Sequence, residues 1–130
     1  MDKAALVDVD ITSGKKILDI LDKAGFKVIV ALWLYTSEFE AWRLYIASPV
    51  VEAEGITRAY LRLLSALRSS DDPDLASRIT ITLLSPKEPL IRAFRRTFAR
   101  AAEVKDGVRL SSQVISDGVF VEQAYLYRVA

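Results

Sequence analysis

Paired carboxylates are the side chains in this sequence whose spacing comes closest to an active-site pattern. Asp8 and Asp10 flank Val9, and on an extended chain alternate residues point the same way. Two carboxylates arranged in this way could hold Mg²⁺, which prefers oxygen ligands. A lone Asp-x-Asp without a third ligand more commonly caps a helix or contacts water, and this is the role we expect here.

Two further motifs are too incomplete to define an active site. The stretch "PDLASRITITL", residues 73–83, begins like the acid motif of some nucleases, but no Glu-x-Lys or Asp-x-Lys follows on the next predicted strand. "TSGKK", residues 12–16, places Gly14 and Lys15 at a predicted helix start, where free backbone N–H groups can bind an anion. It lacks the first glycine of a phosphate-binding loop, so we do not expect nucleotide binding.

The composition excludes several kinds of chemistry. The 130 residues include no histidine and no cysteine, which rules out a Ser-His-Asp or Cys-His nucleophile, a thiol redox centre and a zinc site with ordinary nitrogen and sulfur ligands. Magnesium-dependent phosphoryl chemistry on carboxylates is the enzyme class that remains easy to imagine. We expect no metal and no cofactor, and the sequence favours a non-enzymatic protein.

Basic residues are unevenly distributed along a chain whose net charge is only +1. Residues 57–100 contain nine Lys or Arg against four acids, whereas residues 1–56 contain six against nine. Two predicted helices carry arginines on their polar faces, and these could contact phosphates or an acidic partner because guanidinium is a planar, multiple donor. A solvated basic face is the alternative. The arginines are Arg58 and Arg62 on one helix, and Arg92, Arg96 and Arg100 on the other.

Hydrophobic periodicity predicts three helices and five strands that must position these side chains. Val28–Tyr35 is an unbroken apolar run typical of a central strand covered on both faces. Glu88 and Pro89 predict a helix start, and Asp117-Gly118 predicts a hairpin turn. In chain order the predicted elements are a helix from Thr12 or Ser13 to Gly25, strands 28–35 and 41–48, a helix 56–70, a strand 78–84, a helix 89–104, and strands 108–115 and 119–129.

The order α-β-β-α-β-α-β-β predicts an α+β fold. We expect one domain, residues 1–130, with a mixed or antiparallel sheet that helices cover mainly on one face.

The stretch "ALWLYTSEFEAWRLYIASP", residues 31–49, is predicted to be a β-hairpin, with Trp33 and Trp42 in the core. Few helices cover many aromatic strands, so we expect the other sheet face to remain exposed. That face would serve as a dimer interface, a stacking surface for single-stranded bases or an ordinary solvated face. Alternation along the strands assigns to it Arg43, Tyr45, Thr80, Thr82, Tyr125 and Tyr127.

The sequence favours a small cytoplasmic protein that binds a protein partner or a second copy of itself. The longest apolar run has eight residues, whereas about 20 are needed to cross a bilayer, so we expect no membrane association. The N-terminus lacks the pattern of a signal peptide. The alternative function is a nucleic-acid-binding or magnesium-dependent nuclease-like domain that uses the arginine-rich helices and the scattered acids.

Overall fold

The computed structural model describes residues 6, 8–98 and 107–130. Five strands form one mixed sheet in the order β3-β2-β1-β5-β4, in which only β2 and β3 are parallel. The α+β class and the predicted strand order along the chain are confirmed. The strands are β1 (Val30–Thr36), β2 (Ala41–Ala47), β3 (Ile81–Leu84), β4 (Val108–Val114) and β5 (Phe120–Val129). The helices are α1 (Asp8–Lys23), α2 (Val50–Glu54), α3 (Ile56–Arg68), α4 (Leu75–Arg78) and α5 (Pro89–Thr97), and a 3₁₀ turn, η1, spans Ser116–Gly118.

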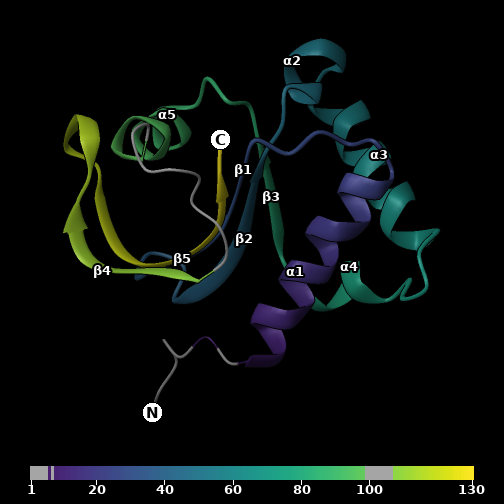
Figure 1. Ribbon diagram of the computed structural model, residues 1–130, viewed down its shortest axis with the longest axis horizontal. Helices are drawn as coiled ribbons and strands as arrows, with labels where there is room; N and C mark the ends of the chain where they lie inside the picture. Colours follow the sequence, from purple (N-terminus) through teal and green to yellow (C-terminus); the bar gives the residue numbers. More distant parts are fainter. Residues whose placement is uncertain (1–5, 7, 99–106) are drawn as a thin grey trace.

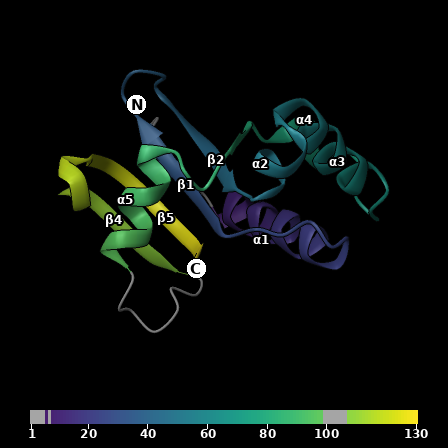
Figure 2. The same cartoon turned by 90° about the horizontal axis from the view of Figure 1, so that it is seen from above.

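Helices lie on both faces of the sheet (Figure 1). Four of them, α1 to α4, gather on one face, which we call the α1 side, while α5 lies on the other, the α5 side, within the curve of β4 and β5 (Figure 2). Strand β1 is central and is buried from Val30 to Leu34, as its apolar run predicts. Its residues alternate between two cores: Trp33 packs on the α1 side, and Leu32 packs on the α5 side.

Close contact between α1 and the sheet depends on Gly14. A Cβ atom at this position would lie 2.3 Å from the Tyr127 hydroxyl oxygen and 2.9 Å from Trp33 Nε1. The Trp33 indole donates a 2.8 Å hydrogen bond to that hydroxyl, which in turn donates a 2.6 Å bond to the Ile11 carbonyl. Gly14 therefore has a packing role in the middle of α1.

A β-bulge directs two consecutive residues of β5 toward α1. Ala31 pairs with Arg128 and Leu32 with Leu126, so Tyr127 is an extra residue between them. While Tyr127 bonds to the first half of α1, Arg128 forms a two-pronged ion pair with Asp22 near its end, at 2.9 and 2.7 Å. These hydrogen bonds hold the pKa of Asp22 below its ordinary value of 3.8.

The beginning of α1 differs from the prediction. The helix starts at Asp8, so Thr12 and Ser13 lie inside it and do not cap it. Acidic residues in a first turn interact favourably with the helix dipole, and Ile11 packs against the core on the α1 side. Both features favour a helix that begins before the predicted N-cap residues.

Other local predictions hold. Pro89 is at the start of α5 with Glu88 as its N-cap residue. The β4–β5 connection turns through Asp117 and Gly118, both with positive φ (62° and 72°). The short helices α2 and α4 were not predicted, and the part of the predicted third helix beyond residue 98 lies outside the described residues. None of the helices in the described part of the chain has the length and apolar character required to cross a bilayer.

Candidate functional site

One row of side chains crosses the α1 side from β4 to β2. Arg109 pairs with Tyr125, Tyr125 with Trp33, and Trp33 with Leu44. The two inner members are buried beneath α1, but Tyr125 is half-buried and Arg109 is exposed. The Arg109 guanidinium lies 5.1 Å from the centre of the Tyr125 ring, a cation–π contact that holds the outer end of the row together.

The next row along the strands has no fully buried member. Ser111 pairs with Gln123, Gln123 with Tyr35, and Tyr35 with Trp42. Ser111 is exposed, and the other three are half-buried. The Tyr35 and Trp42 rings lie 5.8 Å apart, centre to centre. Polar and aromatic side chains are thus side by side on a surface that stays partly open to water.

Together the two rows define one contiguous surface, which we call the aromatic surface: Arg109, Tyr125, Gln123, Tyr35 and Trp42. None of the described helices lies over the outer side of β4 (Figure 1), whereas α1 covers the same side of β5 at Tyr127. Trp, Tyr and Arg are the residue types most enriched at the energetically important positions of protein interfaces. The aromatic surface has this composition.

Strand β4 forms the edge of the sheet next to the aromatic surface. Its residues 111–114 are all exposed, and Ser112 has a positive φ of 48°. At the end of the hairpin, the paired residues Val114 and Phe120 are 68% and 59% exposed. This edge strand therefore offers backbone hydrogen-bonding groups, and two exposed apolar side chains lie at its end.

The opposite edge, β3, is protected. The Tyr60 hydroxyl from α3 donates a 2.9 Å hydrogen bond to the Ile81 carbonyl and accepts a 3.0 Å bond from the Leu83 N–H. The two edges thus differ in their capacity to pair with another strand.

Comparison of the chain with protein-family models, with curated proteins and with solved structures finds no match.

The tyrosine face predicted from strand alternation does not form. Tyr45 is buried on the α5 side, packed in the core that contains Ile91 and Phe94, and burial raises its pKa above 10.0. Tyr127 is buried on the α1 side, where it bonds to Trp33. Of the three predicted tyrosines, only Tyr125 lies on a partly open surface. Alternation orders residues within a strand, but it does not fix the register between β2 and β5.

The polar residues predicted to share that face are also separated from the aromatic surface. Arg43 pairs with Leu34, on the α5 side, and its guanidinium lies 3.7 Å from the centre of the Phe39 ring in the β1–β2 turn. Thr82 pairs with Tyr45 and shares its side of the sheet, whereas Thr80 is exposed just before β3. Tyr35, Trp42 and Gln123 were not predicted to be surface residues. They come together only through pairing between three different strands, which the sequence pattern does not show.

The predicted arginines do not form one patch. Arg58 and Arg62 are exposed on α3, on the α1 side, and Arg62 forms an ion pair with Glu54. Arg92 and Arg96 are exposed on α5, on the opposite side of the sheet. Arg100 lies outside the described residues.

The α5 arginines are partly engaged within the chain. Arg96 Nη1 lies 2.7 Å from an Asp117 carboxylate oxygen, and Arg95 Nε donates a 2.9 Å bond to the Ala130 carbonyl. Both contacts tie α5 to the C-terminal hairpin. Arg92, Arg95 and Arg96 are nevertheless all exposed.

The Asp-x-Asp pair lies in a helix and not in an extended segment. Asp8 and Asp10 lie in the first turn of α1, where residues two apart point to different sides of the helix. The two carboxylates therefore do not point the same way, as they would on an extended chain. Within the described ranges, no three acidic side chains come together as a metal-binding group.

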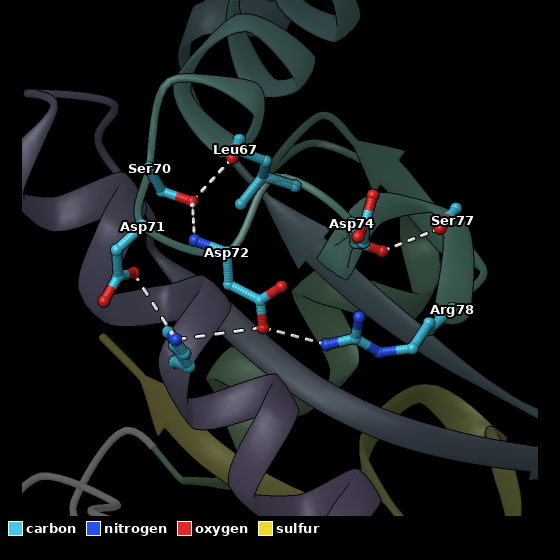
Figure 3. Close-up of polar contacts among 8 residues, drawn as sticks. Leu67, Ser70, Asp71, Asp72, Asp74, Ser77 and Arg78 are labelled. Atoms are coloured by element: carbon cyan, nitrogen blue, oxygen red, sulfur yellow. Dashed lines mark hydrogen bonds and ion pairs between the residues drawn. The ribbon is translucent and has the colours of Figure 1, made fainter.

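A polar cluster after α3 shows how the acids are used (Figure 3). An Asp72 carboxylate oxygen accepts a 2.9 Å bond from Arg78, which lowers the pKa of Asp72 below 3.8. Lys16 of α1 lies 3.4 Å from Asp71 and 3.8 Å from Asp72. Asp74 lies apart from these two carboxylates (Figure 3). The cluster fastens the turn after α3 to α1.

A shallow cleft of about 410 Å³ lies beside this cluster, between the ends of α1 and α3. Ile20, Ala24 and Ala66 contribute its apolar lining, and its rim includes Lys23 and Asp71. These residues bring no set of groups with the mutual geometry of a nucleophile and a base. The aromatic surface remains the stronger candidate for function.

Proposed function

We propose that this chain is a non-enzymatic cytoplasmic protein that binds a protein partner through the aromatic surface and the adjoining edge of β4. The observation that supports this proposal is the pair of cross-strand rows, whose half-exposed rings extend to an unprotected edge strand. A chain without cysteine suits the cytoplasm, where thiols are kept reduced and disulfides are rare.

The surface offers the interactions on which protein recognition depends. An extended segment of a partner could add to β4 through main-chain hydrogen bonds, while pockets between side chains supply specificity. Trp42, Tyr35 and Tyr125 provide rigid apolar area, because aromatic rings lose little conformational freedom on binding. Gln123 and Ser111 provide hydrogen-bonding groups near the rim.

Charge favours protein over nucleic acid at this surface. Among the five described residues that define it, Arg109 is the only cationic one, and each phosphate that a protein neutralises ordinarily requires a Lys or Arg. Asp22, Asp72 and Asp117 are each engaged in an ion pair at a different place in the fold, and among the described residues no three acids come together as a metal-binding group; both observations support the non-enzymatic part of the proposal.

Site-specific photo-crosslinking tests the proposal. A benzophenone amino acid replaces Gln123, within the aromatic surface, and in a separate control protein replaces Ala53, which is exposed on α2. After irradiation in the native cell, we expect a discrete protein adduct from position 123 and none from position 53. The adduct is identified by mass spectrometry.

A purified partner then makes the test quantitative. We expect Tyr35→Ser to weaken binding at least tenfold by calorimetry, while Ser65→Ala, an exposed change on α3, leaves it unchanged. Equal adducts from both probe positions, or an affinity insensitive to Tyr35→Ser, would show that the aromatic surface is not the binding site.

A second candidate function is nucleic-acid binding by α5. The observation in its favour is that α5 exposes Arg92, Arg95 and Arg96, of which Arg96 is paired with Asp117. Fluorescence anisotropy with labelled single- and double-stranded oligonucleotides at low salt tests it. Binding that falls steeply with added salt and decreases in an Arg92→Gln/Arg96→Gln variant would favour this function.

A further inference from the structure

We propose that the partner at the β4 edge is a second copy of this chain, paired antiparallel through β4 so that two sheets become one. This inference rests on the proposed function, because it names the occupant of the same surface. Four features of the described residues lead to it: the unequal edges, the composition of β4, its match to itself, and the closure of the resulting assembly.

The two edge strands of the sheet differ in length and in how far their backbone groups are protected. Strand β3 has only four residues, and Tyr60 satisfies an outward-facing carbonyl and an outward-facing N–H of this edge. Strand β4 has seven residues, of which 111–114 are consecutively exposed. Proteins protect long edges because unpaired backbone groups are a template for another strand. β3 carries such protection and β4 largely lacks it.

The composition of β4 is suited to pairing. The strand, VRLSSQV, contains no proline and one charged residue, Arg109. Charged residues and prolines are the usual devices that keep edge strands apart. The irregular backbone at Ser112 is confined to one residue, and the ladder to β5 resumes at Gln113.

The sequence of β4 is also compatible with antiparallel pairing to β4 of a second copy. Antiparallel pairing over the whole of β4 places its central residue, Ser111, on the two-fold axis, opposite Ser111 of the second copy. Arg109 then lies opposite Gln113, so the one charge on the strand meets a neutral amide and no like charges face each other. Val108 lies opposite Val114, whose side chain is 68% exposed in the single chain. Facing serines are a favourable cross-strand pair.

The assembly closes at two copies. An interface in which each copy presents the same patch is satisfied by a two-fold axis. The remaining edges of the joined sheet are the two β3 strands, which Tyr60 protects. Pairing through β4 therefore forms a dimer without propagating into a fibre. It also joins the two aromatic surfaces across the axis, because Arg109 and Ser111 contribute to both the rows and the edge.

Charge complementation at the axis tests the proposal. Light scattering and sedimentation over about 1 µM to 1 mM are expected to show a monomer–dimer equilibrium for the unmodified chain. In Ser111→Lys alone, like charges face each other across the axis, and in Ser111→Asp alone they do so as well. Each change is expected to raise the dissociation constant at least about fivefold. An equimolar mixture of the two variants should recover the dimer, because Lys then faces Asp.

Ser65→Lys provides the matched control, since Ser65 is an exposed serine on α3. It should leave the dissociation constant unchanged, and circular dichroism verifies that each variant is folded. A strictly monomeric mass up to 1 mM overturns the inference, as does a dimer that is indifferent to Ser111→Lys or is not recovered in the mixture. If the chain is monomeric but position 123 crosslinks to a different protein, the inference fails while the proposed function stands. If position 123 yields no specific adduct and the chain is monomeric, both fail.

Discussion

Replacing Gly14 with alanine should destabilise the protein, although the same change in an exposed helix would stabilise it by about 1 kcal/mol. The new methyl carbon would lie 2.3 Å from the Tyr127 hydroxyl oxygen and 2.9 Å from Trp33 Nε1. Ordinary contacts of a Cβ atom begin near 3.4 Å. Either α1 moves away from the sheet or the Tyr127 ring rotates away from its hydrogen-bond partners.

Each response has a cost. Overpacking a tight site costs about 1–3 kcal/mol, and breaking the buried Trp33–Tyr127 hydrogen bond leaves polar groups unsatisfied at about 1–3 kcal/mol more. After the gain in helix propensity is subtracted, we expect the free energy of unfolding to fall by about 1–5 kcal/mol, centred on about 3 kcal/mol. For a domain of this size that corresponds to a Tm lower by roughly 10 °C.

Urea denaturation followed by tryptophan fluorescence and circular dichroism measures this change. Thr12→Ala, at an exposed position of α1, is the matched control and should be neutral or slightly stabilising. In a Tyr127→Phe background the atom at 2.3 Å is gone, so Gly14→Ala should cost at least about 1 kcal/mol less than in the unmodified chain. A stabilising Gly14→Ala, or equal costs in both backgrounds, would refute the close packing of α1 on Tyr127.

Four further outcomes follow from the geometry. Tyr45→Glu should lower the free energy of unfolding by about 3 kcal/mol or more in urea denaturation, because it buries a carboxylate against α5; an unchanged midpoint would contradict the burial of Tyr45. Tyr60→Phe should cost about 1–2 kcal/mol and increase light scattering on prolonged incubation, because it opens the β3 edge; unchanged stability and scattering would show that Tyr60 does not protect this edge. The folded-state pKa of Asp22 is lowered, so its stabilising contribution is present above about pH 4 and is lost as the pH falls; the difference in stability between the unmodified chain and Asp22→Asn should shrink on acidification, and a difference constant from pH 7 to pH 3 would contradict the ion pair. Replacing Arg92 with Gln should change the urea midpoint little, because Arg92 is exposed on α5; a loss of more than about 1 kcal/mol would mean that it supports the fold.

Local signals in the sequence predicted local structure well. The Asp117-Gly118 pair predicted a turn because glycine, and to a lesser extent aspartate, tolerates positive φ, and both residues adopt it. Glu88 and Pro89 predicted the start of α5 for an equally local reason. The apolar run of β1 predicted burial on both faces. In each case the physical cause lies within a few residues of the signal.

Properties that depend on pairing between distant segments could not be predicted in this way. Tyr45 and Tyr127 have similar neighbours along the chain, but they lie on opposite sides of the sheet. The register decides this, because Leu32 pairs with Tyr45 of β2 and with Leu126, not Tyr127, of β5. The aromatic surface was missed for the same reason, since Tyr35 meets Gln123 only through the β1–β5 register. Arg58 and Arg92 were both predicted to lie on basic helix faces, but the helices that carry them, α3 and α5, lie on opposite sides of the sheet.

The β-bulge in β5 determines how freely α1 can move as a rigid body. Tyr127 and Arg128 are adjacent in the sequence but hold points of the helix at Ile11 and Asp22, which are about 16 Å apart along its axis. Together with the buried side chains of Ile17, Leu18 and Leu21, these two attachments oppose both swinging and sliding of the helix. Deleting one residue at the bulge would restore a regular ladder and direct one of these side chains to the opposite side of the sheet. The orientation of a sixteen-residue helix therefore depends on one inserted residue more than a hundred positions away in the chain.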